Sequence, residues 1–594
     1  MAREAMDAYL AARLAAVHAP LVVGVPPANA FRDLVQLPDG ELRSYGSRDE
    51  CRVYARSRDC GLSWAECPVP EGAMGAAVRS PWSGEWLTVM THGGHAHFAW
   101  RTPDLGERGT YVLRASALDG PCEATRITGV LLGMPRQPLA LKHRPRWITA
   151  TAFSPGDSPS GCYQPVVLYS DDDGHSWEQV VLPPAPPHTI GWPHQGVRWQ
   201  NGAVEPTVVE LSDGRLYMLM RTSQDCHYQA YSEDGGASWS APEPSRFFAT
   251  LTMPTLQALA DGRILALWCN TAALPEFDHE AQLELNANER QGGSEDVFTN
   301  RDAFHAAISD DDGKSWRGFR ELLLNGRRND GDFRSSGGNA GSLDKSIHQS
   351  QAVELPGGKV LVSVGQHAFC RRLVIFDPSW LLEAERSDDF HLGLSDWSVH
   401  QYLKSMAGNF RGIAGHCSFN RCAGARLVPD PAGTPREVLH VARYPDPRLV
   451  LEPQGAVWNF PAGQAGEVSL ELRVPRGGQG VRLCVTDHWF NPVDPVVDQL
   501  AQIVVLVDGV GRVAGSSAFA LDIWQALSLR WDCQAETAAW RLDENEWQEL
   551  PYHHASQDGL SYLHLQSAAE SSDPIGVLLA SVRAASPLLT PLRS

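Results

Sequence analysis

The sequence predicts an all-β chain, with a six-bladed β-propeller followed by a β-sandwich of the jelly-roll kind. Three observations predict this fold class. A short motif with a tight turn recurs four times, a strand–turn–strand pattern recurs between its copies, and both patterns stop before residue 390. Strands that alternate apolar and polar residues then continue toward the C-terminus, as in a sandwich of two sheets.

The recurring motif has the form S-x-D-x-G-x-S-W. It occurs as SRDCGLSW, SDDDGHSW, SEDGGASW and SDDDGKSW, which begin at residues 57, 170, 232 and 309. Serine and aspartate side chains bond backbone amides inside such a turn, glycine permits a positive φ, and tryptophan packs beneath the hairpin. A calcium loop of the EF-hand type would need a final bidentate glutamate, which is missing here. The motif therefore predicts a structural turn between two strands.

The second pattern marks further hairpins between the copies of the motif. It reads VQLPDGELRSYG, VELSDGRLYMLMR, QALADGRILALWC and VELPGGKVLVSVG. The spacing of the two patterns suits four-stranded propeller blades, one of which lies near residues 78–105 and lacks the motif. We expect a helical segment at residues 1–20, six blades at 21–385, and a sandwich at 390–594.

Composition limits the classes of partner. The chain has 594 residues and a net charge of −20, which argues against a nucleic-acid-binding surface because phosphate binding needs a basic face. No run of 18 apolar residues occurs, so no membrane span is expected. The N-terminus lacks the pattern of a signal peptide and the twelve cysteines form no CxxC pair, which predicts a cytoplasmic protein. A homo-oligomer stays open, and no cofactor is expected.

The four motifs with the second pattern resemble the Asp-box propellers of the sialidase superfamily. The resemblance covers roughly residues 25–380. Sialidases grip the carboxylate of their substrate with three arginines from different blades, because guanidinium offers paired donors and keeps its charge. The resemblance places these arginines at Arg32 in FRDLVQLPDG, Arg221 in GRLYMLMRT and Arg301 eight residues before Ser309. It therefore implies an acidic oligosaccharide or glycan as the partner.

The resemblance also suggests acid–base residues. Glu205 stands 16 residues before Arg221, a separation that spans one hairpin and returns both side chains to the same end of neighbouring strands. The alternative is a glutamate–arginine ion pair that only stabilises the blade. Counted back from Trp64, Asp49 takes the place of the family's general acid.

One position departs from the family. Sialidases use a tyrosine, activated by the glutamate, as the nucleophile on a strand of the last blade. Here that strand reads SIHQSQAVELPGGKV, with Gln349 in the tyrosine's place and His348 beside it. Glutamine cannot form the covalent intermediate. Another nucleophile, inversion by an activated water, or elimination with a histidine that moves the proton all stay open.

Several histidines are candidates for contacts with sugar hydroxyls or for proton transfer. His92 and His95 lie in HGGHAH, and His194 lies in WPHQ. The spacing H-x-x-H-x-H could hold a metal, but the hairpin has no acidic partner, so no metal site is expected. Ordinary polar histidines at strand ends are the alternative.

The sequence thus predicts an exo-acting glycoside hydrolase of sialidase type that releases a terminal acidic sugar, either a sialic acid or a related ulosonic or uronic acid. One alternative is a propeller polysaccharide lyase, or another glycosidase acting on uronate-containing oligosaccharides, with a histidine at its centre. Another is a non-catalytic glycan-binding protein. The sandwich resembles lectin-like, concanavalin-type domains.

Overall fold

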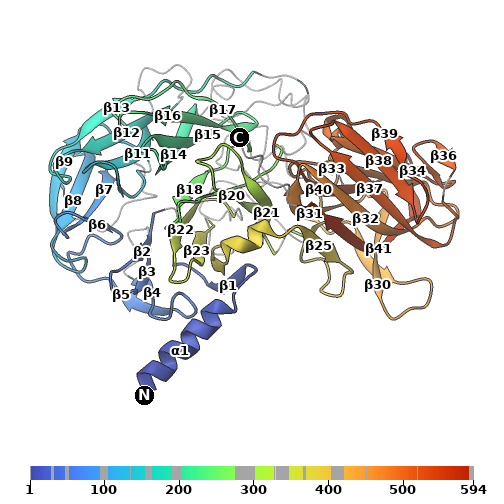
Figure 1. Cartoon of the computed structure of the whole chain (residues 1–594), viewed down its shortest axis with the longest axis horizontal. Helices are drawn as coiled ribbons and strands as arrows, with labels where there is room; N and C mark the ends of the chain where they lie inside the picture. The colour runs from blue at the N-terminus through green and yellow to red at the C-terminus, as the bar shows by residue number, and fades with distance from the viewer. Residues whose placement is uncertain are drawn as a thin grey trace.

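Two β-rich lobes follow one another along the chain (Figure 1). The computed structural model describes residues 2–27, 32–46, 53–93, 105–133, 135–153, 163–189, 192, 202–249, 251–273, 301–326, 328–329, 347–365, 370–402, 421–449, 451–517 and 519–587. The first lobe is a ring of four-stranded antiparallel sheets and the second is a pair of larger sheets. The predicted all-β fold class is confirmed.

Six four-stranded sheets form the propeller, and each is called a blade here. Blade 1 has β2 (Leu34–Gln36), β3 (Leu42–Tyr45), β4 (Val53–Ser57) and β5 (Ala65–Pro68). Blade 2 has β6 (Val78–Arg79), β7 (Trp86–His92), β8 (Gly109–Ala115) and β9 (Glu123–Thr128). Blade 3 has β10 (Leu139–Ala140), β11 (Trp147–Phe153), β12 (Gln164–Ser170) and β13 (Glu178–Val181). Blade 4 has β14 (Ala203–Glu210), β15 (Leu216–Thr222), β16 (Cys226–Ser232) and β17 (Glu243–Phe248). Blade 5 has β18 (Thr255–Ala258), β19 (Ile264–Trp268), β20 (Ala303–Ser309) and β21 (Arg317–Leu324).

Blade 6 closes the ring with strands from both ends of the propeller. It contains β22 (Ser350–Glu354), β23 (Val360–Val364), β24 (Arg372–Phe376) and the N-terminal strand β1 (Leu21–Gly24). β1 pairs antiparallel with β24, with Leu21 opposite Ile375 and Val22 opposite Val374. The first strand of the propeller thus completes its last blade, which joins the two ends of the ring.

The four S-x-D-x-G-x-S-W motifs form the turns between the third and fourth strands of blades 1, 3, 4 and 5. In the second copy, Asp172 accepts from the backbone N–H of Ser176 at 2.8 Å and from its hydroxyl at 2.6 Å. The Trp177 indole donates to the carbonyl of Gly174 at 3.1 Å. Equivalent bonds hold the other three copies. The aspartates therefore satisfy the turn itself.

The sandwich consists of two sheets that share one apolar core. The first contains β29 (Arg426–Pro429), β30 (Glu437–Arg443), β41 (Asp573–Ala585), β32 (Ala465–Arg473), β37 (Trp524–Asp532), β38 (Thr537–Leu542), β39 (Gln548–Leu550) and β25 (Glu385–Asp388). The second contains β26 (Trp397–Ser398), β31 (Gly455–Gly463), β40 (Leu560–Ser567), β33 (Gly480–Thr486), β34 (Ile503–Asp508), β35 (Arg512–Val513) and β36 (Ser516–Ser517). A separate ribbon pairs β27 (Gln401–Tyr402) with β28 (Arg421–Cys422). Alternate residues of β32 point inward, and Val468, Leu470 and Leu472 join the core.

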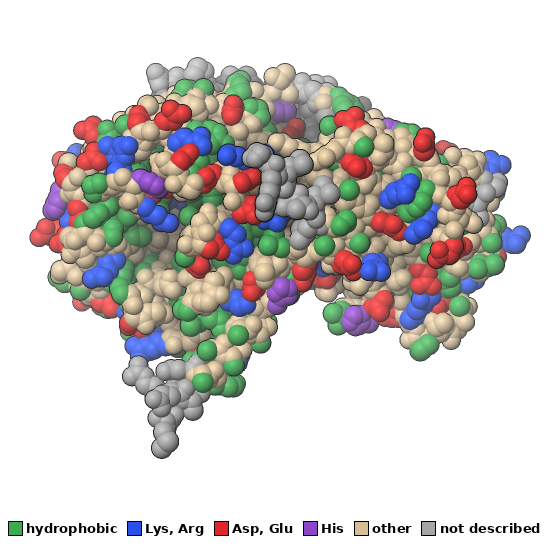
Figure 2. Space-filling view, in the orientation of Figure 1, with side chains coloured by type: hydrophobic (Ala, Val, Ile, Leu, Met, Phe, Trp, Pro, Cys, Tyr) green, Lys and Arg blue, Asp and Glu red, His purple; other side chains and the backbone are tan. Residues whose placement is uncertain are grey.

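Helices are few in the described part of the chain. α1 (Ala2–Ala15) precedes the propeller, η3 (Pro378–Leu382) follows it, and α3 (Val497–Leu500) lies in the sandwich. None of the described helices is long and apolar enough to cross a membrane. On the face shown in Figure 2, acidic and basic side chains are interspersed over both lobes.

Hydrogen bonds join the propeller to the sandwich. The backbone N–H of Trp489 donates to the carbonyl of Asn270 at 3.0 Å, and the N–H of Ala272 donates to the carbonyl of Trp489 at 2.8 Å. The buried Tyr562 hydroxyl donates to a carboxylate oxygen of Glu321 at 2.7 Å. Burial raises the pKa of Glu321 to about 7, against the lowering effect of the Tyr562 hydrogen bond. The two lobes are thus joined by buried polar contacts.

Candidate functional site

The three predicted arginines come from blades 1, 4 and 5, at the ends of strands. Arg32 lies two residues before β2, Arg221 is near the end of β15, and Arg301 lies two residues before β20. All three are buried, with 4%, 4% and 1% of their surface exposed. Burying a guanidinium is costly unless acceptors satisfy its N–H groups. The contacts of each arginine therefore define what it can do.

Glu205 and Arg221 form a buried ion pair in blade 4. Arg221 Nη1 lies 3.1 Å from Glu205 Oε2, and each side chain is 5% exposed. The register of β14 against β15 shifts between Val204 and Thr207, so Glu205 sits in a β-bulge, which re-aims a side chain. Its backbone has a φ of +50°, a conformation that is costly for a residue with a Cβ. Such strain concentrates at functional sites.

Arg301 contacts His348 across blades 5 and 6. Arg301 Nη1 lies 2.9 Å from His348 Nε2, and Arg301 Nη2 donates to the carbonyl of Leu251. Guanidinium is always a donor, so Nε2 is the acceptor nitrogen of the ring. His348 Nδ1 lies 3.4 Å from the backbone nitrogen of Met253. Neutral imidazole has a single acceptor nitrogen, so with Nε2 accepting from Arg301 the ring hydrogen is on Nδ1, which then cannot accept from the Met253 N–H. The ring is 1% exposed.

Arg32 is held by two residues of blade 2 and by Pro135, which lies shortly before blade 3. Its Nη1 donates to the carbonyl of Pro135 at 2.9 Å, and its Nη2 donates to Thr88 Oγ1 at 2.9 Å and to the carbonyl of Val89 at 2.8 Å. Burial lowers the pKa of Arg32, and the adjacent Asp33 partly opposes this. Burial raises the pKa of Asp33 well above its usual range. This end of β2 therefore holds a charged arginine beside a carboxyl that favours its neutral form.

Gln349 occupies the position where the sialidase resemblance expects tyrosine. It lies directly before β22, is 3% exposed, and has a φ of +63°. Its carbonyl accepts from the backbone N–H of Gly365 at 3.1 Å. Leu251, whose carbonyl binds Arg301, also has a positive φ, at 54°. Glu205, Leu251 and Gln349 thus place left-handed residues at or shortly before the innermost strands of three consecutive blades.

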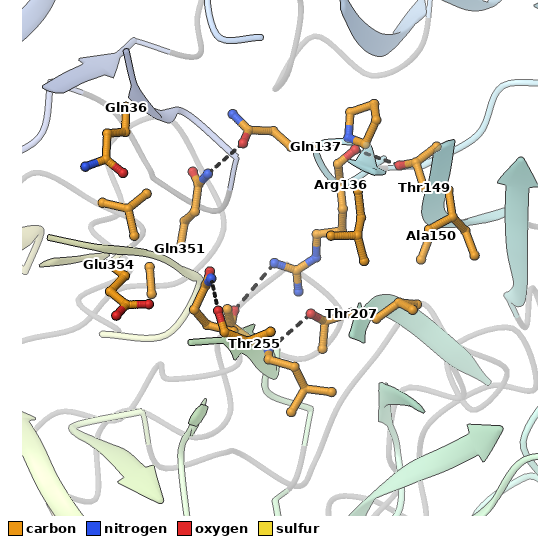
Figure 3. Close-up of a pocket in the computed structure, with 18 residues that line it drawn as sticks. Gln36, Arg136, Gln137, Thr149, Ala150, Thr207, Thr255, Gln351 and Glu354 are labelled. Atoms are coloured by element: carbon orange, nitrogen blue, oxygen red, sulfur yellow. Dashed lines mark hydrogen bonds between the residues drawn. The ribbon is translucent and has the colours of Figure 1, made fainter. Parts of the chain in front are cut away.

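A cavity with mixed polar and apolar walls lies at the propeller centre, along the innermost strands (Figure 3). Its volume is about 390 Å³ and its walls include Gln36, Gln137, Thr207, Thr255 and Gln351. Gln351 donates to Gln137 Oε1 at 2.9 Å, and Gln137 donates to the carbonyl of Arg32 at 2.5 Å. These amides connect blade 6 to the start of blade 3 and to the backbone of Arg32 before blade 1.

Arg136, which our sequence reasoning did not single out, crosses this centre. Its side chain, 9% exposed, projects across the cavity toward Thr255 (Figure 3). It donates to the carbonyls of Pro206 at 3.1 Å and Pro254 at 2.6 Å. Burial lowers its pKa to about 10, against the opposing charge of Glu205. The signal available in the sequence was an arginine within the apolar stretch VLLGMPRQPLAL.

No described contact joins the remaining predicted residues to Glu205, Arg221, Arg301 or His348. His92 ends β7 and packs edge-on against Tyr111, with ring centroids 6.4 Å apart. Asp49, His95 and His194 lie outside the described residues. Among the described residues, no cluster of three or more histidine, cysteine, aspartate or glutamate side chains could hold a metal ion.

Comparisons with known proteins found a match to a family model and similarities to solved structures. Residues 123–332 match a family model described as a BNR repeat-like domain. No curated protein matches the chain. Among solved structures, a Dyadobacter fermentans protein of unknown function has 16% identity and a TM-score of 0.37, over 60% of this chain and 97% of that chain. Trypanosoma rangeli sialidase has 11% identity and a TM-score of 0.33, over 95% and 92%. Its complex with 2,3-difluorosialic acid, a covalent intermediate, has 12% identity and a TM-score of 0.34, over 95% and 92%.

Proposed function

We infer that this chain, a member of the sialidase and BNR-repeat superfamily, is an exo-acting glycosidase that releases a terminal acidic sugar. The observation that carries the proposal is that the three predicted arginines are buried at strand ends of blades 1, 4 and 5, with Arg221 paired to Glu205 and Arg301 in contact with His348. Hydrogen-bond donors that the folded protein already holds in place bind an anion without a further loss of side-chain conformational entropy. A carboxylate on a pyranose is the anion that this arrangement suits, because guanidinium groups match its two oxygens.

The proposed chemistry is a direct displacement by water. Gln349 has no group that can form a glycosyl intermediate, so the two-step route of a retaining enzyme is not expected from it. Glu205 takes a proton from water as the water oxygen bonds to the anomeric carbon. The glycosidic C–O bond breaks, and Asp49 protonates the departing oxygen. This route inverts the anomeric configuration. The role of Asp49 stays a prediction, because that residue lies outside the described part of the chain.

Glycan binding without turnover is the second candidate. The observation that favours it is Gln349 itself, since the residue that replaces the nucleophile cannot react. The elimination route receives less support from the contacts of His348. Its Nε2 lies 2.9 Å from Arg301 Nη1 and the ring is 1% exposed, which suits the positioning of Arg301 better than the transfer of a substrate proton.

The test is an activity screen on α- and β-linked glycosides of sialic, other ulosonic and uronic acids. The readouts are the free reducing acid and its first-formed anomer, observed by ¹H NMR. We expect release of one class of acidic sugar with inversion. Arg221→Ala should lower kcat/KM by about a hundredfold or more, because it removes a charge-assisted contact. Arg215→Ala is the matched control, since Arg215 pairs with Asp213 on the exposed turn of the same blade.

The outcomes separate the candidates. Binding of acidic glycans without any product would favour the non-catalytic protein. A product that absorbs near ~232 nm would indicate an unsaturated uronate formed by proton abstraction, and so the lyase. An Arg221→Ala variant with unchanged activity and unchanged binding would refute the proposed site.

A further inference from the structure

Arg136 holds the backbone on which Glu205 stands. Its Nε donates to the carbonyl of Pro206 at 3.1 Å, and its Nη2 lies 3.3 Å from the carbonyl oxygen of Glu205. The same Nη2 donates to the carbonyl of Pro254 in the next blade at 2.6 Å. One planar group thus binds two successive carbonyls of the bulge in β14 and one carbonyl before β18. The planar guanidinium has several N–H donors at fixed angles and can bind several carbonyls at once, whereas a lysine ammonium group carries its charge and donors on one atom.

The base of Arg136 is itself fixed in blade 3. Its backbone N–H donates to the carbonyl of Ala150 at 3.0 Å, and its carbonyl accepts from Thr149 Oγ1 at 2.7 Å. Both partners belong to β11, which also pairs with β12 over its full length. The guanidinium is therefore anchored in one blade while it holds the backbone of the next two.

The bulge needs such support because its conformation is unfavourable. Glu205 has a φ of +50°, which residues with a Cβ adopt only where their surroundings over-determine it. The carbonyls of Glu205 and Pro206 do not follow the regular ladder, since the register is interrupted between Val204 and Thr207. Arg136 supplies hydrogen-bond donors to these carbonyls. The orientation of the Glu205 carboxylate toward Arg221 depends on the same backbone.

We propose that Arg136 is a positioning residue, which holds the left-handed bulge at Glu205 and so sets the Glu205 carboxylate against Arg221 for the reaction. This inference rests on the proposed function, and it adds a residue that does not touch the substrate. Small displacements of an acid–base group lower the rate strongly, and about 1 Å can cost about a hundredfold. Loss of Arg136 should therefore act mainly on kcat, because the three substrate-binding arginines remain.

The cavity at the propeller centre makes the proposal testable by chemical rescue. Arg136 lines it together with residues at the far ends of the inner strands, among them Gln36 and Glu354. Gln36 is exposed to solvent, and Figure 3 shows the guanidinium of Arg136 inside this space. Truncation of the arginine enlarges the cavity where the guanidinium was. Guanidinium or ethylguanidinium added to the solution can then occupy that place.

The experiment compares Arg136→Ala, Arg136→Lys and the matched control Arg146→Ala. Arg146 is also a buried arginine of blade 3, but it pairs with Asp171 at 2.6 Å in the turn motif. We expect Arg136→Ala to have a kcat about a hundredfold below that of the wild type, with a KM within about threefold of the wild-type value. Added ethylguanidinium should raise the kcat of this variant about tenfold. Arg136→Lys should recover only part of kcat, and Arg146→Ala should keep the wild-type kcat and show no rescue.

A crystal structure of Arg136→Ala tests the positioning without reference to activity. We expect residue 205 to leave the left-handed region and the Glu205–Arg221 contact to open beyond hydrogen-bonding distance. An unchanged bulge and ion pair, or a wild-type kcat, overturns the proposal. If neither Arg136 variant folds, Arg136 is a core support and the proposal is also overturned. If the wild-type protein cleaves no acidic glycoside, the proposed function fails, while the crystal structure still decides whether Arg136 holds Glu205.

Discussion

The ion pair between Glu205 and Arg221 leads to a quantitative prediction about stability. We consider Arg221→Met, Glu205→Met and the double variant. Each single change leaves one charged group in a site where both side chains are 5% exposed. Breaking a buried pair by removing one partner costs about 3–5 kcal/mol, whereas replacing both partners by apolar groups is often close to neutral. We therefore expect each single variant to be less stable than the double variant.

The geometry sets the size of the coupling. At 3.1 Å, Coulomb's law with an effective dielectric constant of about 20 gives an attraction of about 5 kcal/mol. Desolvation of both charges offsets part of this gain. We expect the free energy of unfolding of the double variant to exceed the additive expectation by about 3 kcal/mol. The backbone strain at Glu205 is present in all four proteins and therefore cancels.

The assay is urea unfolding followed by tryptophan fluorescence and circular dichroism. The two lobes can unfold in separate steps, so the transition that responds to these variants is followed at constant m-value. Arg215→Met is the control, because Arg215 and Asp213 form an exposed pair, 38% and 48% accessible, in the same blade. It should change stability by less than about 1 kcal/mol. Additive effects of Glu205→Met and Arg221→Met, within about 0.5 kcal/mol, would refute the coupling.

Three further predictions concern the interface, a turn motif and the histidine. Burial raises the pKa of Glu321 from 4.5 to about 7, so the folded state binds more protons than the unfolded state between these values. The wild type should therefore lose about 3 kcal/mol of stability as pH rises through this window. The Glu321→Gln variant should not lose stability over this pH range. Urea midpoints that depend on pH in the same way in the wild type and in this variant would contradict the prediction. Asp172→Ala removes an acceptor used by two groups of Ser176 and should cost about 2 kcal/mol. Neither calcium nor EDTA should shift the unfolding midpoint of the wild type or this variant, and stabilisation of the wild type alone by calcium would contradict the structural reading of the turn. His348→Ala should weaken binding of the acidic sugar about tenfold, because Arg301 loses an acceptor. The pH–rate profile should keep its shape, and loss of a limb from that profile would instead indicate proton transfer by His348.

Local patterns in the chain predict the blades well. The four S-x-D-x-G-x-S-W turns and the D-G or G-G hairpins depend on side chains that bond backbone groups a few residues away, so they can be read from short stretches. The separation of 16 residues between Glu205 and Arg221 predicted their contact for the same reason, since one hairpin joins them. The glutamine at position 349 is likewise visible in the sequence, and it changes the expected chemistry.

Contacts between distant segments needed the tertiary structure. The pairing of Leu21 with Ile375 closes the ring, and the strand at Glu385–Asp388 joins the edge of β41. Neither partner carries a local signal for the other. The left-handed backbone at Glu205 and the path of Arg136 from blade 3 to blades 4 and 5 also depend on which blades become neighbours. Short-range patterns in the chain thus specify the repeated turns, the hairpins and the chemical types at the candidate site. The closed ring alone decided which buried charges meet, because those contacts arise only when separate blades pack around one centre.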